Sequence, residues 1–163
     1  ELDRPRADAR PMGLATVVRA GRDVTLVAYG AMVRTALDAA TAADDEGVSL
    51  EVIDLRSLSP LDHATVDASV RRTGRLVVVH EAPREAGLAA EVITGVAERC
   101  FAALRSAPVR ITGHDLPYPP AKTEQHFLPD LDRILDGGIA RWDAQQHDGN
   151  GAMTEGFLLP DLG

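Results

Sequence analysis

The 163-residue sequence predicts an α/β fold, a three-layer α/β/α sandwich around a mostly parallel sheet of about five strands with one antiparallel edge strand. Short apolar segments alternate with longer segments whose apolar residues recur at helical spacing. The connections between the apolar segments are long enough for the crossovers that parallel strands need. In addition, 45% of the residues are hydrophobic, which is sufficient for the core of one ordinary domain.

The first third of the chain contains two expected strands and a helix. Residues 1–14 are charged and contain two prolines, so we expect a connecting arm from an upstream domain. The apolar segments 15–19 and 24–29 flank a turn at 20–23, and this pattern predicts a hairpin in which the two segments are antiparallel neighbours. Helical spacing then continues until Gly47 provides a stop.

The middle of the chain adds two strands and a helix. Residues 49–55 are expected to form a parallel strand. The helix that follows is expected to begin with Ser59 as its N-cap and Pro60 at its first position, and to end at Gly74. Residues 75–81 form a nearly continuous β-branched run, which is typical of a central strand covered on both faces.

The last part of the domain repeats the alternation. We expect a helix over 88–104, a strand over 108–113, a proline-rich loop, and a short closing helix at 131–142. The predicted domain therefore covers residues 15–142. Trp142 lies at its end, and we expect this side chain to pack back on the domain.

Composition limits the classes of partner. The chain has 25 acidic and 17 basic residues and a net charge of -8, which argues against nucleic acid and anionic membranes. The single cysteine, Cys100, cannot form a disulfide within the chain, and this fits a reducing cytoplasm. No segment has the pattern of a signal peptide or a membrane span. We expect a cytoplasmic protein.

Functional residues in such sheets gather at the carboxyl ends of the strands. His80 and Glu81, followed by Arg84, form the sharpest cluster at these ends. One hypothesis is an acid–base pair in a small independent enzyme. Adjacent strand residues point to opposite faces, however, which favours an interface or structural role. Because the sequence lacks cofactor-binding glycine motifs and metal-ligand spacings, we assign no catalytic, cofactor-binding or metal-binding residue to this chain.

Several separated segments occur in an order that indicates a family. VTLVAYGAMVRTALDAA, VSLEVIDLRSLSPLD, TGRLVVVHEAPREAGLAAEV, PVRITGHDLPYPPA and FLPDLDRIL resemble the transketolase C-terminal domain of the β subunit of thiamine-diphosphate-dependent 2-oxo acid dehydrogenases. The resemblance covers about residues 11–136. The segments HEAP and PYPPA are more similar to the branched-chain 2-oxo acid type than to the pyruvate type.

The resemblance implies a role within a larger enzyme. The whole enzyme would oxidatively decarboxylate a 2-oxo acid on thiamine diphosphate with Mg, and would transfer the acyl group to lipoyl. The coenzyme would be held by the α subunit and the preceding domain of β, so we expect this domain alone to be inactive. The implied partners are a second β subunit in an α2β2 heterotetramer, the α subunit and the acyltransferase component. Expected interface residues are His80, Glu81, Arg84, Tyr118, Pro119 and Pro120.

Two alternatives to this assignment remain open. The parent could be a pyruvate or acetoin dehydrogenase, because the residues that select the substrate lie around the coenzyme and outside this chain. The chain could also be a free-standing protein–protein adaptor with the same fold. The second alternative is a function from a different class.

The end of the sequence departs from the family pattern. Residues 143–156 are polar and contain glycines, a composition that predicts a linker. Residues 157–163, FLLPDLG, resemble the opening strand of a lipoyl domain. One hypothesis is a parent protein that fuses the β subunit to the acyltransferase. The other is a C-terminal extension whose similarity is due to chance.

Overall fold

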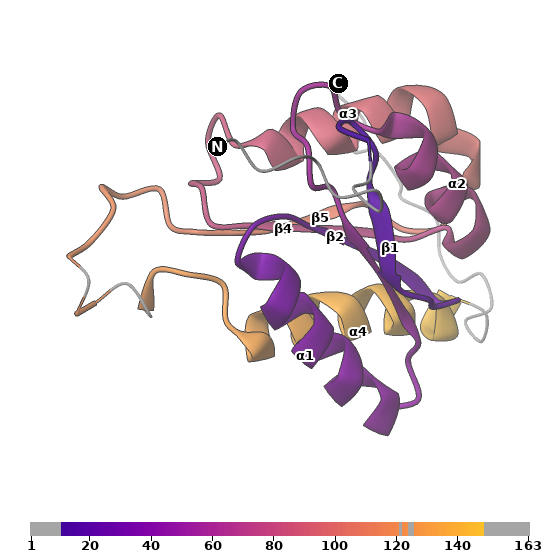
Figure 1. Ribbon diagram of the computed structural model, residues 1–163. Helices are drawn as coiled ribbons and strands as arrows, with labels where there is room; N and C mark the ends of the chain where they lie inside the picture. The colour runs from indigo at the N-terminus through magenta and orange to yellow at the C-terminus, as the bar shows by residue number, and fades with distance from the viewer. Residues whose placement is uncertain (1–10, 121, 124–125, 149–163) are drawn as a thin grey trace, which may run out of the picture.

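The computed structural model describes residues 11–120, 122–123 and 126–148, which form a five-stranded sheet covered by helices on both faces (Figure 1). The expected α/β class, with a mostly parallel sheet and one antiparallel edge strand, is confirmed. The elements in chain order are β1 (Thr16–Arg19), β2 (Val24–Ala28), α1 (Met32–Asp45), β3 (Leu50–Asp54), α2 (His63–Thr73), β4 (Leu76–His80), α3 (Leu88–Cys100), the 3₁₀ helix η1 (Phe101–Ala103), β5 (Val109–Thr112) and α4 (Leu131–Asp148).

The sheet has the order β1-β3-β2-β4-β5. Strands β2 to β5 are parallel, whereas β1 pairs antiparallel with β3. The predicted hairpin between β1 and β2 is therefore wrong. Both edges of β2 are occupied, one by β3 and the other by β4, so β1 passes to the free edge of β3. The turn between the two strands is a link between non-adjacent strands.

The start of α2 also differs from the sequence prediction. The helix begins at His63 with Asp62 as its N-cap, and not at Ser59 and Pro60. One Asp62 carboxylate oxygen accepts a hydrogen bond from Thr65 N at 3.1 Å, and the other accepts one from Ala15 N at 3.0 Å. Asp62 therefore caps the helix and also ties the segment before β1 to it.

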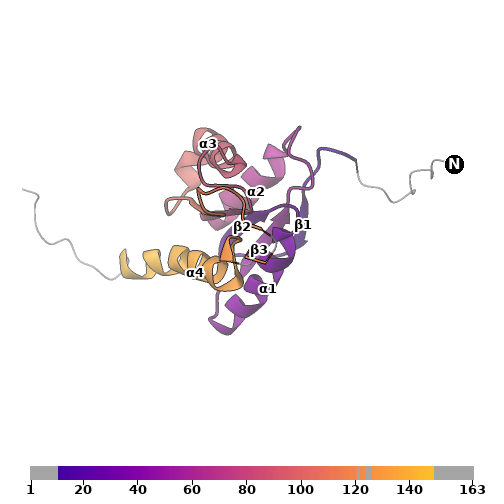
Figure 2. The ribbon, with the colours of Figure 1, turned by 90° about the vertical axis from the view of Figure 1, so that its left-hand side faces the viewer.

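Two helical layers enclose the sheet, with α1 and α4 on one face and α2 and α3 on the other (Figures 1 and 2). Alternate residues of the strands point to opposite faces, as the pleat requires. On β2, for example, Leu26 faces α1 and α4 whereas Val27 faces α2 and α3. Both side chains are fully buried, which explains why this strand has no polar alternation in its sequence.

Helix α4 is longer than the short closing helix that the sequence predicts, because it continues to Asp148. Gly137 and Gly138 lie where it packs on the sheet. A Cβ on Gly137 would be 2.5 Å from Ile111 Cδ1, so glycine permits this close approach. Trp142 packs against the same core cluster, which confirms the expected packing of this side chain.

The extended α4 also affects the expected domain boundaries. The first residues of the expected linker 143–156 are helical. The remainder of that linker, the expected lipoyl segment 157–163, and residues 1–10 of the expected arm lie outside the described residues. Within the described ranges, none of the helices combines the length and the apolar composition needed to cross a membrane.

Candidate functional site

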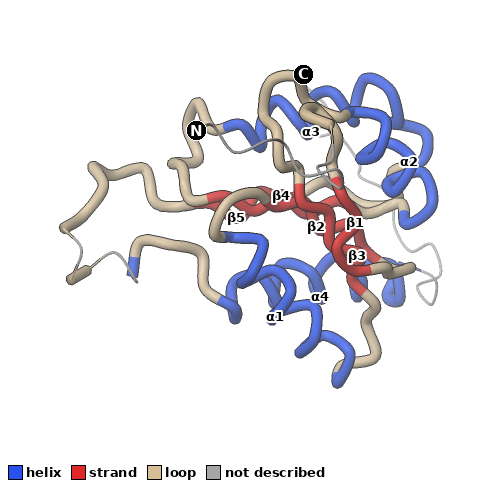
Figure 3. Tube along the Cα trace, viewed as in Figure 1, coloured by secondary structure: helices blue, strands red, loops and turns tan. Residues whose placement is uncertain are grey.

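The carboxyl ends of β4 and β5 lie side by side, because His80 is paired in register with Thr112. Two connections leave the sheet there. The β4–α3 turn comprises residues 81–87, and the β5–α4 loop runs from 113 to 130 and projects away from the sheet (Figure 3). Apart from His80, which ends β4, the residues expected at an interface all lie in these two connections.

Hydrogen bonds join the β4–α3 turn to the β5–α4 loop. Gly113 N donates to the carbonyl oxygen of Ala82 at 3.1 Å, and Glu85 N donates to Asp115 Oδ1 at 2.9 Å. Gly113 must be a glycine, because a Cβ there would overlap the Glu81 carbonyl oxygen and would be 2.6 Å from Phe127 Cε1. The two connections therefore form one continuous surface.

An aromatic cluster supports the outer part of this surface. Phe127 is buried, and the Tyr118 ring packs edge-on against it with centroids 5.1 Å apart. The His114 ring also lies edge-on to Phe127, with centroids 6.1 Å apart. Even so, Tyr118 stays 57% exposed and Leu116 66% exposed. The loop thus exposes large apolar side chains to solvent, while its start is held in place by the contacts described above.

His80 occupies a different environment from the other proposed interface residues. Its side chain is fully buried in this chain, so the interface role of His80 stays a prediction that the exposed surface does not support. The ring stacks on Tyr29 with centroids 6.0 Å apart. A Cβ on Gly87 would be 2.6 Å from His80 Cε1, so a glycine at the start of α3 makes room for the imidazole.

The electrostatics of His80 follow from burial. Neither ring nitrogen has a partner with hydrogen-bond geometry within the described residues, although the Ala82 backbone is close enough to favour the charged form. Burial lowers the pKa of His80, and the positive charge of Arg110 lowers it further. Burial likewise raises the pKa of Tyr29, and the Glu81 carboxylate adds to that rise. The buried imidazole is therefore held neutral.

The remaining proposed interface residues lie at or near the surface. Glu81 and Pro119 are half-buried, whereas Arg84 and Pro120 are exposed. No hydrogen bond joins His80 to Glu81 in the part of the chain that the structure describes. The hypothesis of an acid–base pair therefore has no geometric support.

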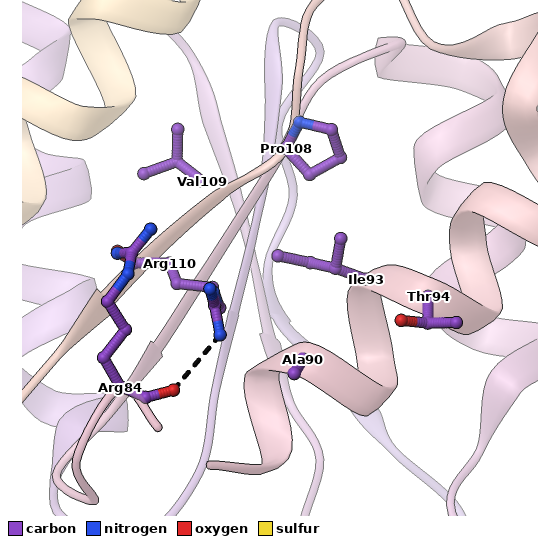
Figure 4. A pocket seen from close by; sticks show the side chains of 7 residues that line it. All are labelled: Arg84, Ala90, Ile93, Thr94, Pro108, Val109 and Arg110. Atoms are coloured by element: carbon purple, nitrogen blue, oxygen red, sulfur yellow. Dashed lines mark hydrogen bonds between the residues drawn. The ribbon is translucent and has the colours of Figure 1, made fainter. Parts of the chain in front are cut away.

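A pocket that no sequence motif indicates lies between α3 and the edge strand β5. It has a volume of about 370 Å³, and its lining residues are Arg84, Ala90, Ile93, Thr94, Pro108, Val109 and Arg110 (Figure 4). We refer to it as the α3–β5 pocket. Arg84 and Arg110 are far apart in the sequence, and only the parallel pairing of β4 with β5 brings them together. The sequence signal for this pocket is an arginine between two apolar residues, Val109 and Ile111, of the edge strand.

Metal ligands do not gather in the described part of the chain. No group of three or more His, Cys, Asp or Glu side chains there is arranged to hold a metal ion. Mg²⁺ bound to a diphosphate takes part of its oxygen ligands from the phosphates and from water, so this finding concerns the protein side chains alone.

Comparisons with known proteins identify the family. Residues 13–134 match the family model described as "Transketolase, C-terminal domain". The chain is 50% identical over 126 residues to the pyruvate dehydrogenase E1 component subunit beta of Leifsonia xyli subsp. xyli. It is 51% identical over 127 residues to the 3-methyl-2-oxobutanoate dehydrogenase subunit beta of Mycobacterium tuberculosis. These matches cover 77% of this chain but only 37% and 36% of the relatives, so the chain spans little more than a third of their length.

A solved structure shows the same fold. The "Split gene transketolase, inactive beta4 tetramer" superimposes with a TM-score of 0.71 at 27% sequence identity, covering 82% of this chain and 44% of that chain. The segment that matches the family model contains every strand of the sheet, from β1 to β5. The chain belongs to the transketolase C-terminal domain family, in the group whose relatives are β subunits of pyruvate and branched-chain 2-oxo acid dehydrogenases.

Proposed function

We propose that this chain is an assembly domain of a β subunit in a 2-oxo acid dehydrogenase complex. The observation that carries the proposal is the identity of about half to β subunits of such dehydrogenases, over one continuous domain. The complete enzyme oxidatively decarboxylates a 2-oxo acid and transfers the acyl group to lipoyl. The cytoplasm is the proposed compartment, where the buried Cys100 stays reduced.

The proposed contact surface is the joined β4–α3 turn and β5–α4 loop. Its exposed Leu116 and Tyr118 would be covered in a complex, and burial of such side chains favours association. Hydrogen bonds hold the base of the loop, so little ordering is required when it binds. The proposed partners are a second β subunit, the α subunit and the acyltransferase component.

Thiamine diphosphate with Mg would supply the stabilised carbanion chemistry of decarboxylation. No step of the reaction is assigned to the described residues, among which no cluster of three or more His, Cys, Asp or Glu side chains could hold a metal ion. We place the coenzyme in the α subunit and in the part of β that precedes this domain. Calorimetric titration of the 163-residue chain with thiamine diphosphate and Mg should show no binding, and tight binding would contradict the assignment.

The assembly role is tested with full-length β subunit and its α subunit. Leu116→Ser with Tyr118→Ser removes the exposed apolar groups of the loop, and with them the ring contact of Tyr118 with the buried Phe127. Sedimentation should show a weakened β–β or α–β association, while the isolated domain stays folded and loses only the small stability of that ring contact. Phe101→Ser is the matched control, because Phe101 is 76% exposed on η1, away from this loop. Equal association of all variants would contradict the proposal.

The substrate of the whole enzyme is proposed to be a branched-chain 2-oxo acid. The HEAP and PYPPA segments support this choice, whereas the 50% identity to a pyruvate dehydrogenase β subunit keeps pyruvate as the second candidate. Rates of the reconstituted α and β subunits on 3-methyl-2-oxobutanoate and on pyruvate decide between them. Equal rates, or faster turnover of pyruvate, would contradict the branched-chain choice.

The proposed fusion to an acyltransferase rests on residues 157–163 alone. The test is the sequence of the parent gene beyond Gly163. A lipoyl domain that continues from FLLPDLG would support the fusion, and a stop codon there would end it.

A further inference from the structure

The α3–β5 pocket brings two arginines to one rim. Arg110 Nη1 donates a hydrogen bond to the Arg84 carbonyl oxygen at 3.1 Å, and Arg84 Nη1 donates to the Arg110 carbonyl oxygen at 3.4 Å. These reciprocal bonds draw both side chains to the edge of β5, and Figure 4 shows Ala90, Ile93 and Thr94 on α3 across from them. Each guanidinium carries five N–H donors, so most of these donors are left for another acceptor.

The charge at this rim is not balanced by neighbouring carboxylates. No Asp or Glu lines the pocket, and neither Arg84 nor Arg110 forms an ion pair among the described residues. The two like charges repel, and they do so on a chain whose net charge is -8. An oxyanion placed between them would relieve the repulsion and accept forked hydrogen bonds from both.

The rest of the pocket is mostly aliphatic. Ile93 from α3 lies across from Pro108 at the start of β5, whereas the Val109 side chain points to the other face of the sheet and packs with the α1 and α4 cluster. Thr94 adds a hydroxyl group at the exposed margin. A volume of about 370 Å³ is at the small end of ligand pockets, so it suits a molecule with few heavy atoms. The pocket thus has two positively charged arginines at one edge and a small apolar surface beside them.

We propose that the α3–β5 pocket binds a small free carboxylate whose oxyanion is held by Arg84 and Arg110 and whose short aliphatic chain lies on Ile93 and Pro108. This pocket shares Arg84 with the β4–α3 turn of the proposed assembly surface, whereas its other lining residues lie on α3 and at β5. The failures of the two proposals are distinguishable, because one is measured by ligand binding and the other by subunit association.

The test is an NMR titration of the ¹⁵N-labelled 163-residue chain with 3-methylbutanoate. Amide shifts should saturate and should be confined to Ile93, Thr94, Val109, Arg110 and their chain neighbours. Acetate should bind at least about fivefold more weakly, since it lacks the apolar chain. The uncharged 3-methylbutanamide should not saturate. Inorganic phosphate distinguishes a general anion site, and phosphate binding as tight as 3-methylbutanoate would overturn the proposed ligand class.

Variants locate the site. Arg110→Met should weaken 3-methylbutanoate binding about tenfold, and Arg84→Lys should weaken it less because the charge remains but the fork is lost. Arg34→Met is the control, since Arg34 is exposed on α1, on the other side of the sheet, where it forms an ion pair with Asp38. Should Arg110→Met not fold, Arg84→Met replaces it. Unchanged binding in both arginine variants, or shifts spread over the opposite face, would overturn the proposal.

Discussion

The guanidinium group of Arg75 lies over the indole ring of Trp142, 5.1 Å from the ring centroid. Arg75 is itself buried and donates hydrogen bonds from Nη1 to the carbonyl oxygens of Asp23 and Thr73. The last part of α4 is therefore held against the segment that enters β4. Because Trp142 is the only tryptophan, the fluorescence of the chain reports on the packing of this part of α4.

We predict a blue-shifted Trp142 emission that moves toward the water value on unfolding. Trp142→Ala should lower the free energy of unfolding by about 2 kcal/mol, less than for a fully buried tryptophan because Trp142 is half-buried. Urea denaturation followed by circular dichroism measures this change. A water-like emission of the folded chain would contradict the packing of Trp142.

A second prediction concerns a cluster of hydroxyl groups buried between β2 and α2. Thr25 Oγ1 lies 2.6 Å from Ser69 Oγ and 2.7 Å from Thr73 Oγ1. Thr25→Val keeps the shape but leaves the Ser69 hydroxyl without its hydrogen-bond partner, so it should cost about 1–3 kcal/mol. Adding Ser69→Ala removes the unsatisfied group.

The double variant Thr25→Val with Ser69→Ala should therefore be no less stable than Thr25→Val alone. Urea denaturation of the two single variants and the double variant gives the coupling energy. Strict additivity of the two changes would show that the hydroxyl groups act independently and would refute the prediction.

Gly87 and Gly30 provide a matched pair for a third prediction. A Cβ on Gly87 would overlap the Pro83 carbonyl oxygen and press on the His80 ring, whereas a Cβ on Gly30 would meet nothing within 4 Å. Gly30 has a φ of +61°, so alanine there carries only the backbone penalty of about 1 kcal/mol. Gly87→Ala should cost about 3 kcal/mol, near the top of the range for overpacking. Thermal unfolding of both variants compares the two effects, and equal losses would contradict the steric argument.

The lowered pKa of His80 leads to a prediction about pH. In the unfolded chain this imidazole binds a proton below about pH 6.5. In the folded chain the buried imidazole has a lower pKa, so protonation requires a lower pH. The contribution of His80 to stability is therefore present above the unfolded pKa and is lost as the pH falls toward the lower folded pKa.

Free energies of unfolding at about pH 7.5 and about pH 5 measure the effect. The difference between the two pH values should shrink in His80→Gln, which cannot titrate. Arg110→Met should raise the pKa of His80 in an NMR titration, because it removes a repulsive positive charge. An unchanged pH dependence in His80→Gln would show that another group is responsible.

Much of the fold could be predicted because the central strands are buried on both faces. Val24–Ala28 and Leu76–His80 are entirely buried, so their sequences are almost continuous in apolar residues. The partner of β1 could not be predicted, since a short turn after a strand has the same local pattern whether or not the two strands pair. The pairing depends on which edges are free, and this is decided by the whole sheet.

Local ambiguity also explains the helix start and the missed pocket. Ser59 with Pro60 and Asp62 with Thr65 are both reasonable starts, and Asp62 is used because it also binds the backbone of Ala15. The burial of His80 depends on α3 covering the end of β4, which no local pattern reveals. The approach of Arg84 to Arg110 depends likewise on sheet pairing.

Helix α4 closes one whole face of the sheet, together with α1, although it is the last described element of the domain. During synthesis from the N-terminus, Leu50, Val79 and Ile111 lack the cover that α4 provides until residues 131–148 have left the ribosome. One face of the sheet therefore stays exposed, apolar and prone to aggregation for most of the time that the ribosome takes to synthesise the domain. A chain released from a ribosome that stalls before α4 would expose this apolar face to chaperones and proteases. The synthesis of α4 therefore decides whether the domain escapes cellular quality control.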